Sequence, residues 1–191
     1  MNRYWPVGLG LFLGLSALVL GIVSGSNLDE GWQFAARWTA RISFPLFMLT
    51  FVASSLAILY PSKTTKKLLR NRRYWGLGFA ACFVIHLVAL LVFNWRIGEF
   101  PPAGLLDPGV IAYTILLAMV LTSNAKAQKS MGRAWTWLHR TGMWGFLVIF
   151  GRPGDDAIAI TYMVIALSGA GLRIAAWLKR RNQSQKTKQT P

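Results

Sequence analysis

Cysteine, histidine and acidic side chains are all scarce in this sequence of 191 residues. The single cysteine, Cys82, excludes an internal disulfide and a metal cluster held by thiolates. The two histidines and six acidic residues supply neither a pair of carboxylates nor a complete set of zinc ligands within the apolar segments. The sequence also lacks a convincing strand followed by a glycine-rich phosphate-binding motif. These absences argue against hydrolytic and nucleotide-binding enzymes.

Charge is also in short supply. Charged residues make up 14% of the chain, whereas 54% of the residues are hydrophobic and the mean hydropathy is +0.41. A water-soluble domain carries more charge. The apolar residues form blocks of roughly 20, the length that crosses about 30 Å of hydrocarbon as a helix rising about 1.5 Å per residue. The sequence therefore predicts an integral membrane protein.

Six apolar blocks alternate with polar stretches, and we expect each block to form one transmembrane helix. The first block resembles a secretory signal peptide, but its apolar run is longer than a usual signal core, so we expect it to be retained. The predicted fold class is an all-α, polytopic membrane helix bundle. The expected spans cover residues 7–24, 34–60, 74–95, 110–123, 135–150 and 157–178.

Lysine and arginine are concentrated in alternate connections between these spans. They gather after the second, fourth and sixth spans, whereas all six acidic residues fall in the other connections. Because cytoplasmic loops carry the excess of lysine and arginine, we expect both termini in the cytoplasm. We predict one transmembrane domain over residues 1–180, a disordered basic cytoplasmic tail over 181–191, and a multi-pass location in a bacterial-type inner (plasma) membrane.

The net charge of +15 does not indicate a nucleic-acid-binding protein, because the basic residues lie in clusters beside the expected spans. Besides the bilayer itself, anionic lipid is the expected partner of these clusters. Each lysine or arginine near an acidic leaflet contributes about 1 kcal/mol of attraction, so we expect the loop at residues 63–73 to anchor strongly.

Two histidines lie inside expected spans, His86 in the third and His139 in the fifth. An ionisable side chain in a transmembrane helix is costly and indicates a functional site. Imidazoles on two different membrane helices suit the axial ligation of a haem iron. Alternatively, each histidine makes a hydrogen bond to a neighbouring helix. The residues alone leave both interpretations open.

Four arginines also fall within the expected spans. Arg37 and Arg41 lie four residues apart and share one helix face, while Arg140 and Arg173 lie toward the cytoplasmic side. Arginine can neutralise the propionates of haem, which makes Arg41 a candidate cofactor-binding residue. The simpler interpretation is that all four side chains extend to the membrane interface.

Three stretches carry a family resemblance: Thr39-Ala40-Arg41, RNRRYWGLGFAACFVIH at 70–86 and LTSNAKAQKSMGRAWTWLH at 121–139. Across residues 39–150 the chain resembles the ferric reductase-like transmembrane domain, and within that family the haem-binding membrane subunits of the MsrQ (YedZ) type. The resemblance implies b-type haem, electron transfer within or across the membrane, and His86 and His139 as iron ligands.

One position departs from the family pattern. Members commonly carry a second histidine about 13 residues after the first on the fifth helix, where this chain has Arg152. Helix geometry also separates the two candidates, since at about 1.5 Å per residue His86 lies roughly 18 Å and His139 roughly 6 Å from the cytoplasmic side. Three alternatives follow: a shared iron with strong helix tilt, separate haems with Met143 as a substitute ligand one turn beyond His139, or loss of haem.

We therefore expect a haem-bearing electron relay, supplied by a separate flavin reductase or by quinol and passing electrons to an acceptor across the membrane. The chain has no nucleotide domain of its own, so any flavin or quinone comes from a partner. Whether the chain is itself an enzyme stays open; it fits an electron-transfer subunit of an oxidoreductase system. The alternative function is a cofactor-free membrane scaffold or partner-binding subunit on the same fold.

Overall fold

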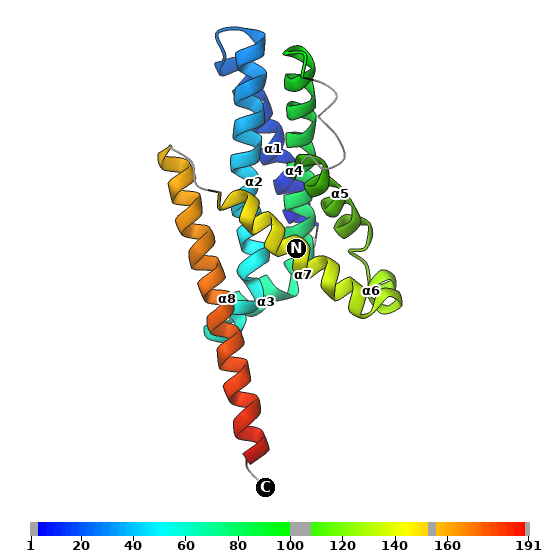
Figure 1. Cartoon of the computed structure of the whole chain (residues 1–191), viewed down its shortest axis with the longest axis vertical. Helices are drawn as coiled ribbons and strands as arrows, with labels where there is room; N and C mark the ends of the chain where they lie inside the picture. Colours follow the sequence, from blue (N-terminus) through cyan, green and yellow to red (C-terminus); the bar gives the residue numbers. More distant parts are fainter. Residues whose placement is uncertain (1–3, 100–107, 153–155, 190–191) are drawn as a thin grey trace.

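The computed structural model describes residues 4–99, 108–152 and 156–189. Over these residues the chain folds into helices and contains no strand (Figure 1). The helices are, in order, α1 (Trp5–Ser24), α2 (Leu28–Leu59), α3 (Lys63–Arg70), α4 (Arg72–Arg96), α5 (Pro108–Leu121), α6 (Ala125–Met131), α7 (Arg133–Phe150) and α8 (Ala157–Gln189).

Four helices of the described chain, α1, α2, α4 and α8, are long and apolar enough to cross a membrane. A fifth span is added if α5 and α6, which meet at a bend of 105°, form one broken span. The helix α7 lies where the fifth span was expected, but Arg133, His139 and Arg140 in its first half lower its hydropathy. Length and composition therefore support four or five of the six predicted spans.

Close backbone contacts hold α1 against α2 and α4. A Cβ atom added to Gly10 of α1 would overlap the carbonyl oxygen of Gly78 on α4, and one added to Gly21 would overlap the backbone of Ala35 on α2. Helices in lipid associate mainly by van der Waals packing, which small residues improve by letting the backbones approach. The glycines of α1 thus fix the position of α1 beside α2 and α4.

A proline lies inside α2. Pro45 has no N–H, so the carbonyl oxygen of Arg41 loses its donor within the helix. Tyr162 of α8 supplies a replacement, because its hydroxyl donates a hydrogen bond to that oxygen at 3.0 Å. Backbone groups in a membrane need partners from the protein, since hydrocarbon offers none. The proline therefore creates an attachment point for α8.

Phenylalanine rings fill the centre of the bundle between α2, α4 and α7. The Phe146 ring of α7 packs edge to face against Phe79 and Phe83 of α4, with centroids 5.3 and 5.6 Å apart. We call this cluster the phenylalanine core. Its members are Phe47, Phe51, Phe79, Phe83, Phe146 and Phe150.

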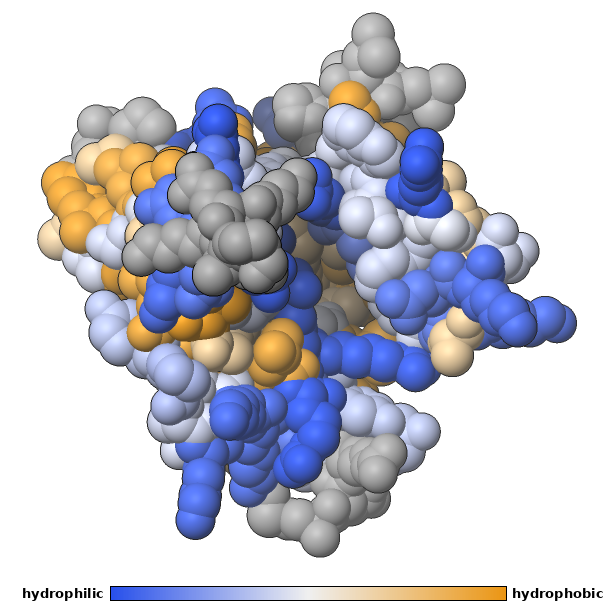
Figure 2. Space-filling model, turned by 90° about the horizontal axis from the view of Figure 1, so that it is seen from below, coloured by the Kyte–Doolittle hydropathy of each residue, from blue (hydrophilic) through white to orange (hydrophobic). Residues whose placement is uncertain are grey.

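Basic and acidic side chains lie at opposite ends of the bundle. The lower part of Figure 1 contains α3, α6 and the last turns of α8, which are rich in lysine and arginine, and we call it the basic end. Viewed from this end, many hydrophilic side chains and some hydrophobic ones border a hollow in the surface (Figure 2). The upper part is the acidic end, which holds the four acidic residues that the structure describes, Asp29, Glu30, Glu99 and Asp156.

Both described chain ends lie toward the basic end. Trp5 at the start of α1 packs against Trp75 near the start of α4, with ring centroids 5.0 Å apart. On α8, Lys179 donates a hydrogen bond to the carbonyl oxygen of Ile58 near the end of α2 at 3.0 Å. The helix α8 then continues to Gln189, through the segment that we expected to be a disordered tail.

Candidate functional site

His86 is held against α2 by a buried threonine. Its Nδ1 lies 3.2 Å from Oγ1 of Thr39, and the Thr39 hydroxyl donates its own hydrogen to the carbonyl oxygen of Ala35 at 2.6 Å. Oγ1 therefore accepts a hydrogen bond from Nδ1–H of His86, which assigns the tautomer. Nε2 then carries a free lone pair, the arrangement that a metal requires of a neutral imidazole.

His86 lines a cavity of about 560 Å³ between α2, α4, the end of α7 and the start of α8. This volume lies within the roughly 300–1,000 Å³ typical of small-molecule and cofactor sites. The wall combines apolar and aromatic side chains with two arginines. The lining residues are Arg37, Ala40, Arg41, Phe83, His86, Ile149, Phe150, Asp156, Ile158, Ala159 and Tyr162.

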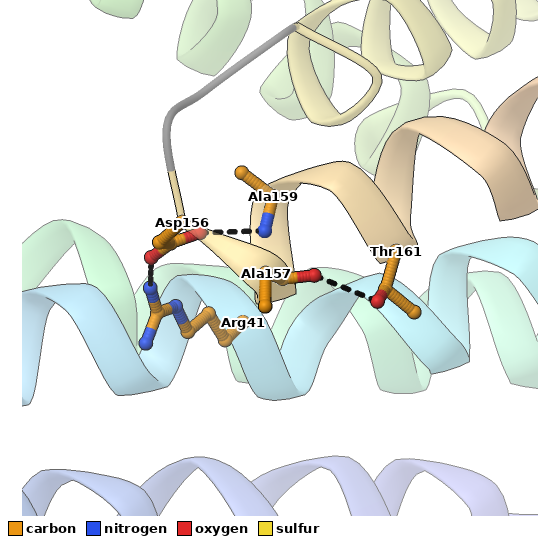
Figure 3. A network of polar contacts seen from close by, with 5 residues as sticks. All are labelled: Arg41, Asp156, Ala157, Ala159 and Thr161. Atoms are coloured by element: carbon orange, nitrogen blue, oxygen red, sulfur yellow. Dashed lines mark hydrogen bonds and ion pairs between the residues drawn. The ribbon is translucent and has the colours of Figure 1, made fainter.

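Arg41 and Asp156 form an ion pair on the wall of this cavity (Figure 3). The second carboxylate oxygen of Asp156 accepts a hydrogen bond from the backbone N–H of Ala159 at 2.6 Å, so the same side chain caps α8. The Arg41 guanidinium also lies 5.2 Å from the centre of the Trp38 ring. Arg41 therefore joins α2 to the start of α8, whereas Arg37 makes no ion pair with the described residues.

His139 occupies a different environment on α7. Its Nδ1 lies 3.1 Å from the carbonyl oxygen of Trp135, and its ring stacks on the Trp135 indole with centroids 4.0 Å apart. Because a carbonyl oxygen can only accept, Nδ1 is the protonated nitrogen. Nε2 is buried and forms no hydrogen bond with the described residues. His139 therefore also presents an unprotonated nitrogen.

The structure does not bring the two predicted iron ligands together. On α7 the residues that line the His86 cavity are Ile149 and Phe150, ten and eleven positions beyond His139. At about 1.5 Å per residue this places His139 roughly 15 Å farther along the helix, toward the basic end. Phe146 of the phenylalanine core lies between His139 and Phe150 on α7, and Phe83 and Phe150 of the same core line the cavity.

The two remaining positions singled out in the sequence also have distinct places. Met143, one turn beyond His139, is buried in the core with 5% of its surface exposed. Arg152, which replaces the family histidine, is exposed just beyond the end of α7 and does not line the His86 cavity.

No group of three His, Cys, Asp or Glu side chains in the described part of the chain could hold a metal ion. Each histidine instead offers one nitrogen beside apolar rings. Such a donor suits a metal whose other ligands are supplied by a cofactor.

Sequence reasoning did not identify Tyr162 as part of the site. The signal available for it was Pro45, which predicts a carbonyl oxygen without a donor four residues earlier on α2. The identity of the donor could not be read, because Tyr162 lies 121 residues from Arg41 in the sequence.

Comparison with known proteins gives one consistent family. The chain matches the ferric reductase like transmembrane component over residues 36–150. It is 30% identical over 154 residues to the protein-methionine-sulfoxide reductase heme-binding subunit MsrQ of Yersinia pseudotuberculosis serotype O:1b (strain IP 31758), covering 77% of this chain and 73% of the relative. The MsrQ subunit of Yersinia pestis (strain Pestoides F) is also 30% identical, with coverages of 77% and 72%. No solved structure matches. These matches confirm the resemblance noted in the sequence, and the chain belongs to the ferric reductase-like transmembrane family, as a relative of the MsrQ subunits.

Proposed function

We propose that this chain is a membrane-embedded subunit that binds b-type haem and relays electrons. The observation that carries the proposal is the His86 site, where a histidine with a fixed tautomer lines a cavity of cofactor size. The MsrQ relatives, which are named as heme-binding subunits, point in the same direction.

The residues around His86 fit a haem. Nε2 of His86 would hold the iron, and the hydrogen bond from Nδ1 to Thr39 would keep the ring oriented, as partners of ligating histidines generally do. Arg37 and Arg41 on the cavity wall would neutralise the carboxylates of the haem. Phe83 and Phe150 exclude water from one side. When bound, haem supplies a reversible one-electron couple, and the protein supplies position, polarity and burial.

His139 is proposed as a second and separate ligand position. Its Nε2 has no partner among the described residues, and its level in the bundle differs from that of His86. Met143 follows it by one turn and would provide a thioether near the same level. Two levels of haem would divide the passage of an electron through the bundle into two shorter steps.

The membrane arrangement that we propose has six passes, in which α5 with α6 and α7 complete the four clear spans. The basic end then faces the cytoplasm of a bacterial-type inner membrane, in agreement with the distribution of lysine and arginine. Electrons would enter from a separate flavin reductase docked on the basic end, or from quinol, and leave to an acceptor on the other side.

A reduced-minus-oxidised absorption spectrum of the purified full chain tests the proposal. We expect a b-type α band that decreases in H86A and, separately, in H139A, with Y113F as control because Tyr113 lies beside His86 without hydrogen-bonding it. Complete loss of the α band in either single variant would show that both histidines bind the same iron. Colourless protein from haem-replete cells, folded by size-exclusion chromatography, would overturn haem binding.

The second candidate function is a cofactor-free scaffold or partner-binding subunit. It is favoured by the position of Arg152, because the described residues place no second histidine at the His86 cavity. In that case both histidines serve the packing of the helices, through hydrogen bonds such as those to Thr39 and Trp135. The same spectrum distinguishes the two functions.

A further inference from the structure

Three arginines gather near the basic end, outside the His86 cavity. Arg72 begins α4, Arg140 lies on α7 and Arg173 lies on α8, and both other arginines are within electrostatic range of Arg173. We call them the arginine cluster. They come from three different helices, so only the folded bundle brings them together.

Arg173 is the most enclosed of the three. Its guanidinium lies over the Phe51 ring at 4.4 Å and near the Trp144 ring at 5.6 Å. Its NH1 atom is buried and has no hydrogen-bond partner among the described residues. Guanidinium on aromatic faces is a stable arrangement, but it leaves the N–H donors in the plane of the group unsatisfied.

The other two arginines are held beside it. Nε of Arg72 donates a hydrogen bond at 2.9 Å to the carbonyl oxygen of Thr50, the residue that precedes Phe51. Arg140 lies one turn before Trp144 on α7, and its side chain is exposed. The cluster therefore combines one enclosed guanidinium with two that border it.

The described chain supplies no acid to balance these charges. Its four acidic residues lie at the acidic end, and the two ion pairs they form involve Arg41 and Arg96. Cations of like sign that are partly removed from water repel one another unless an anion lies between them. The described residues therefore leave the positive charge of the arginine cluster without a counterion.

We propose that the arginine cluster binds the phosphate of an anionic phospholipid from the leaflet at the basic end. Planar guanidinium groups match the geometry of phosphate oxygens. The residues that follow Arg173 on α8 favour a lipid as the source, since Ile174, Trp177 and Leu178 are exposed by 54%, 57% and 46% and offer an apolar surface to acyl chains. The proposal needs only a membrane protein and does not rest on haem binding.

Native mass spectrometry of the purified, delipidated full chain tests this site by titration with phosphatidylglycerol or phosphatidylcholine. We expect one phosphatidylglycerol to bind preferentially, and R173Q to weaken that binding about fivefold or more. R180Q is the matched control, because Arg180 is an exposed arginine on the same helix and its loss changes the net charge equally. The lipid affinity of R173K should be intermediate, since lysine keeps the charge but lacks the planar guanidinium that binds two phosphate oxygens at once.

If R173Q and R180Q weaken phosphatidylglycerol binding equally, the attraction is diffuse and the proposed site is wrong. Equal binding of phosphatidylcholine and phosphatidylglycerol would also overturn the site. Unchanged lipid binding together with a lower haem content in R173Q would assign the anion to a haem carboxylate instead, and the lipid proposal would fail. If R173Q does not fold, R140Q carries the same comparison, because the Arg140 side chain is exposed.

Discussion

The hydroxyl of Tyr162 donates a hydrogen bond to the carbonyl oxygen of Arg41 at 3.0 Å, in the place of the N–H that Pro45 lacks. One hydrogen bond thus satisfies the backbone of α2 and attaches α8 at the same point. The ion pair between Arg41 and Asp156 reinforces this attachment near the start of α8. The wall of the His86 cavity that α8 supplies depends on both contacts.

Removal of the Tyr162 hydroxyl should destabilise the bundle. We expect Y162F to lower the free energy of unfolding by about 0.5–2 kcal/mol, because the Arg41 carbonyl loses its donor within the membrane. Y113F is the control, since the Tyr113 hydroxyl has no partner among the described residues, and it should be close to neutral. Unfolding in detergent measures both variants. In a P45A background, which restores an N–H at position 45, the Y162F effect should disappear; an unchanged effect would contradict the explanation.

Removal of the Thr39 hydroxyl should loosen a haem bound at His86. T39V keeps the side-chain volume but deletes the acceptor of Nδ1–H. Losses of such supporting contacts typically reduce metal affinity about 10–100-fold. Transfer of haem to apomyoglobin, followed by absorption, measures the change. T50V is the control, because the Thr50 hydroxyl bonds to the carbonyl of Leu46 in its own helix and to no other described residue. Equal haem loss from T39V and T50V would show that the contact to His86 does not matter.

An added methyl group at Gly10 should separate α1 from α4. The Cβ of alanine in G10A would overlap the Gly78 carbonyl oxygen, and a backbone cannot move aside as a side-chain end does. Overpacking of this kind costs about 1–3 kcal/mol. Thermal unfolding followed by circular dichroism should therefore show a lower midpoint for G10A. G8A is the matched control on the same helix, with nothing within 4 Å of the added Cβ, and a similar loss there would rule out close packing as the cause.

Two substitutions of Asp156 separate its two contacts. D156N keeps an oxygen that accepts from Ala159 N–H and removes only the charge, whereas D156A removes both. Loss of an N-cap costs about 1 kcal/mol, and a partly exposed ion pair contributes about 0–1 kcal/mol. D156A should therefore be less stable than D156N in thermal unfolding, and R41A should resemble D156N. Equal destabilisation by D156N and D156A would mean that the charge, not the cap, holds the start of α8.

Much of the fold could be predicted because bilayer thickness sets the length of apolar runs. The expected spans 7–24 and 74–95 fall within two residues of α1 and α4 at both ends. The short helices α3 and α6 were not expected, since they carry polar residues and no long apolar run. α3 depends on a local capping box in which Ser62 and Thr65 exchange hydrogen bonds, and a search for apolar blocks does not detect such a signal.

The sites were harder to predict, because their contacts join distant parts of the chain. The sequence identified His86 and His139 and predicted a difference in depth between them, and in the structure His139 does not line the His86 cavity. The sequence could not indicate that Arg72, Arg140 and Arg173 lie close together. Their helices must first pack around Phe51 and Trp144. For these arginines the sequence supported only the simpler interpretation, extension to the interface.

The phenylalanine core between the two histidine levels has an electrical consequence. Its six rings carry no proton donor or acceptor, so under the proposed function they would pass an electron through this layer without moving a proton. Such a step is electrogenic. Moving one elementary charge across the whole membrane changes the free energy by about 2.3 kcal/mol per 100 mV, and this layer would experience a fraction of that. The rate of electron passage would thus depend on membrane voltage, through the thickness of this layer of phenylalanine rings.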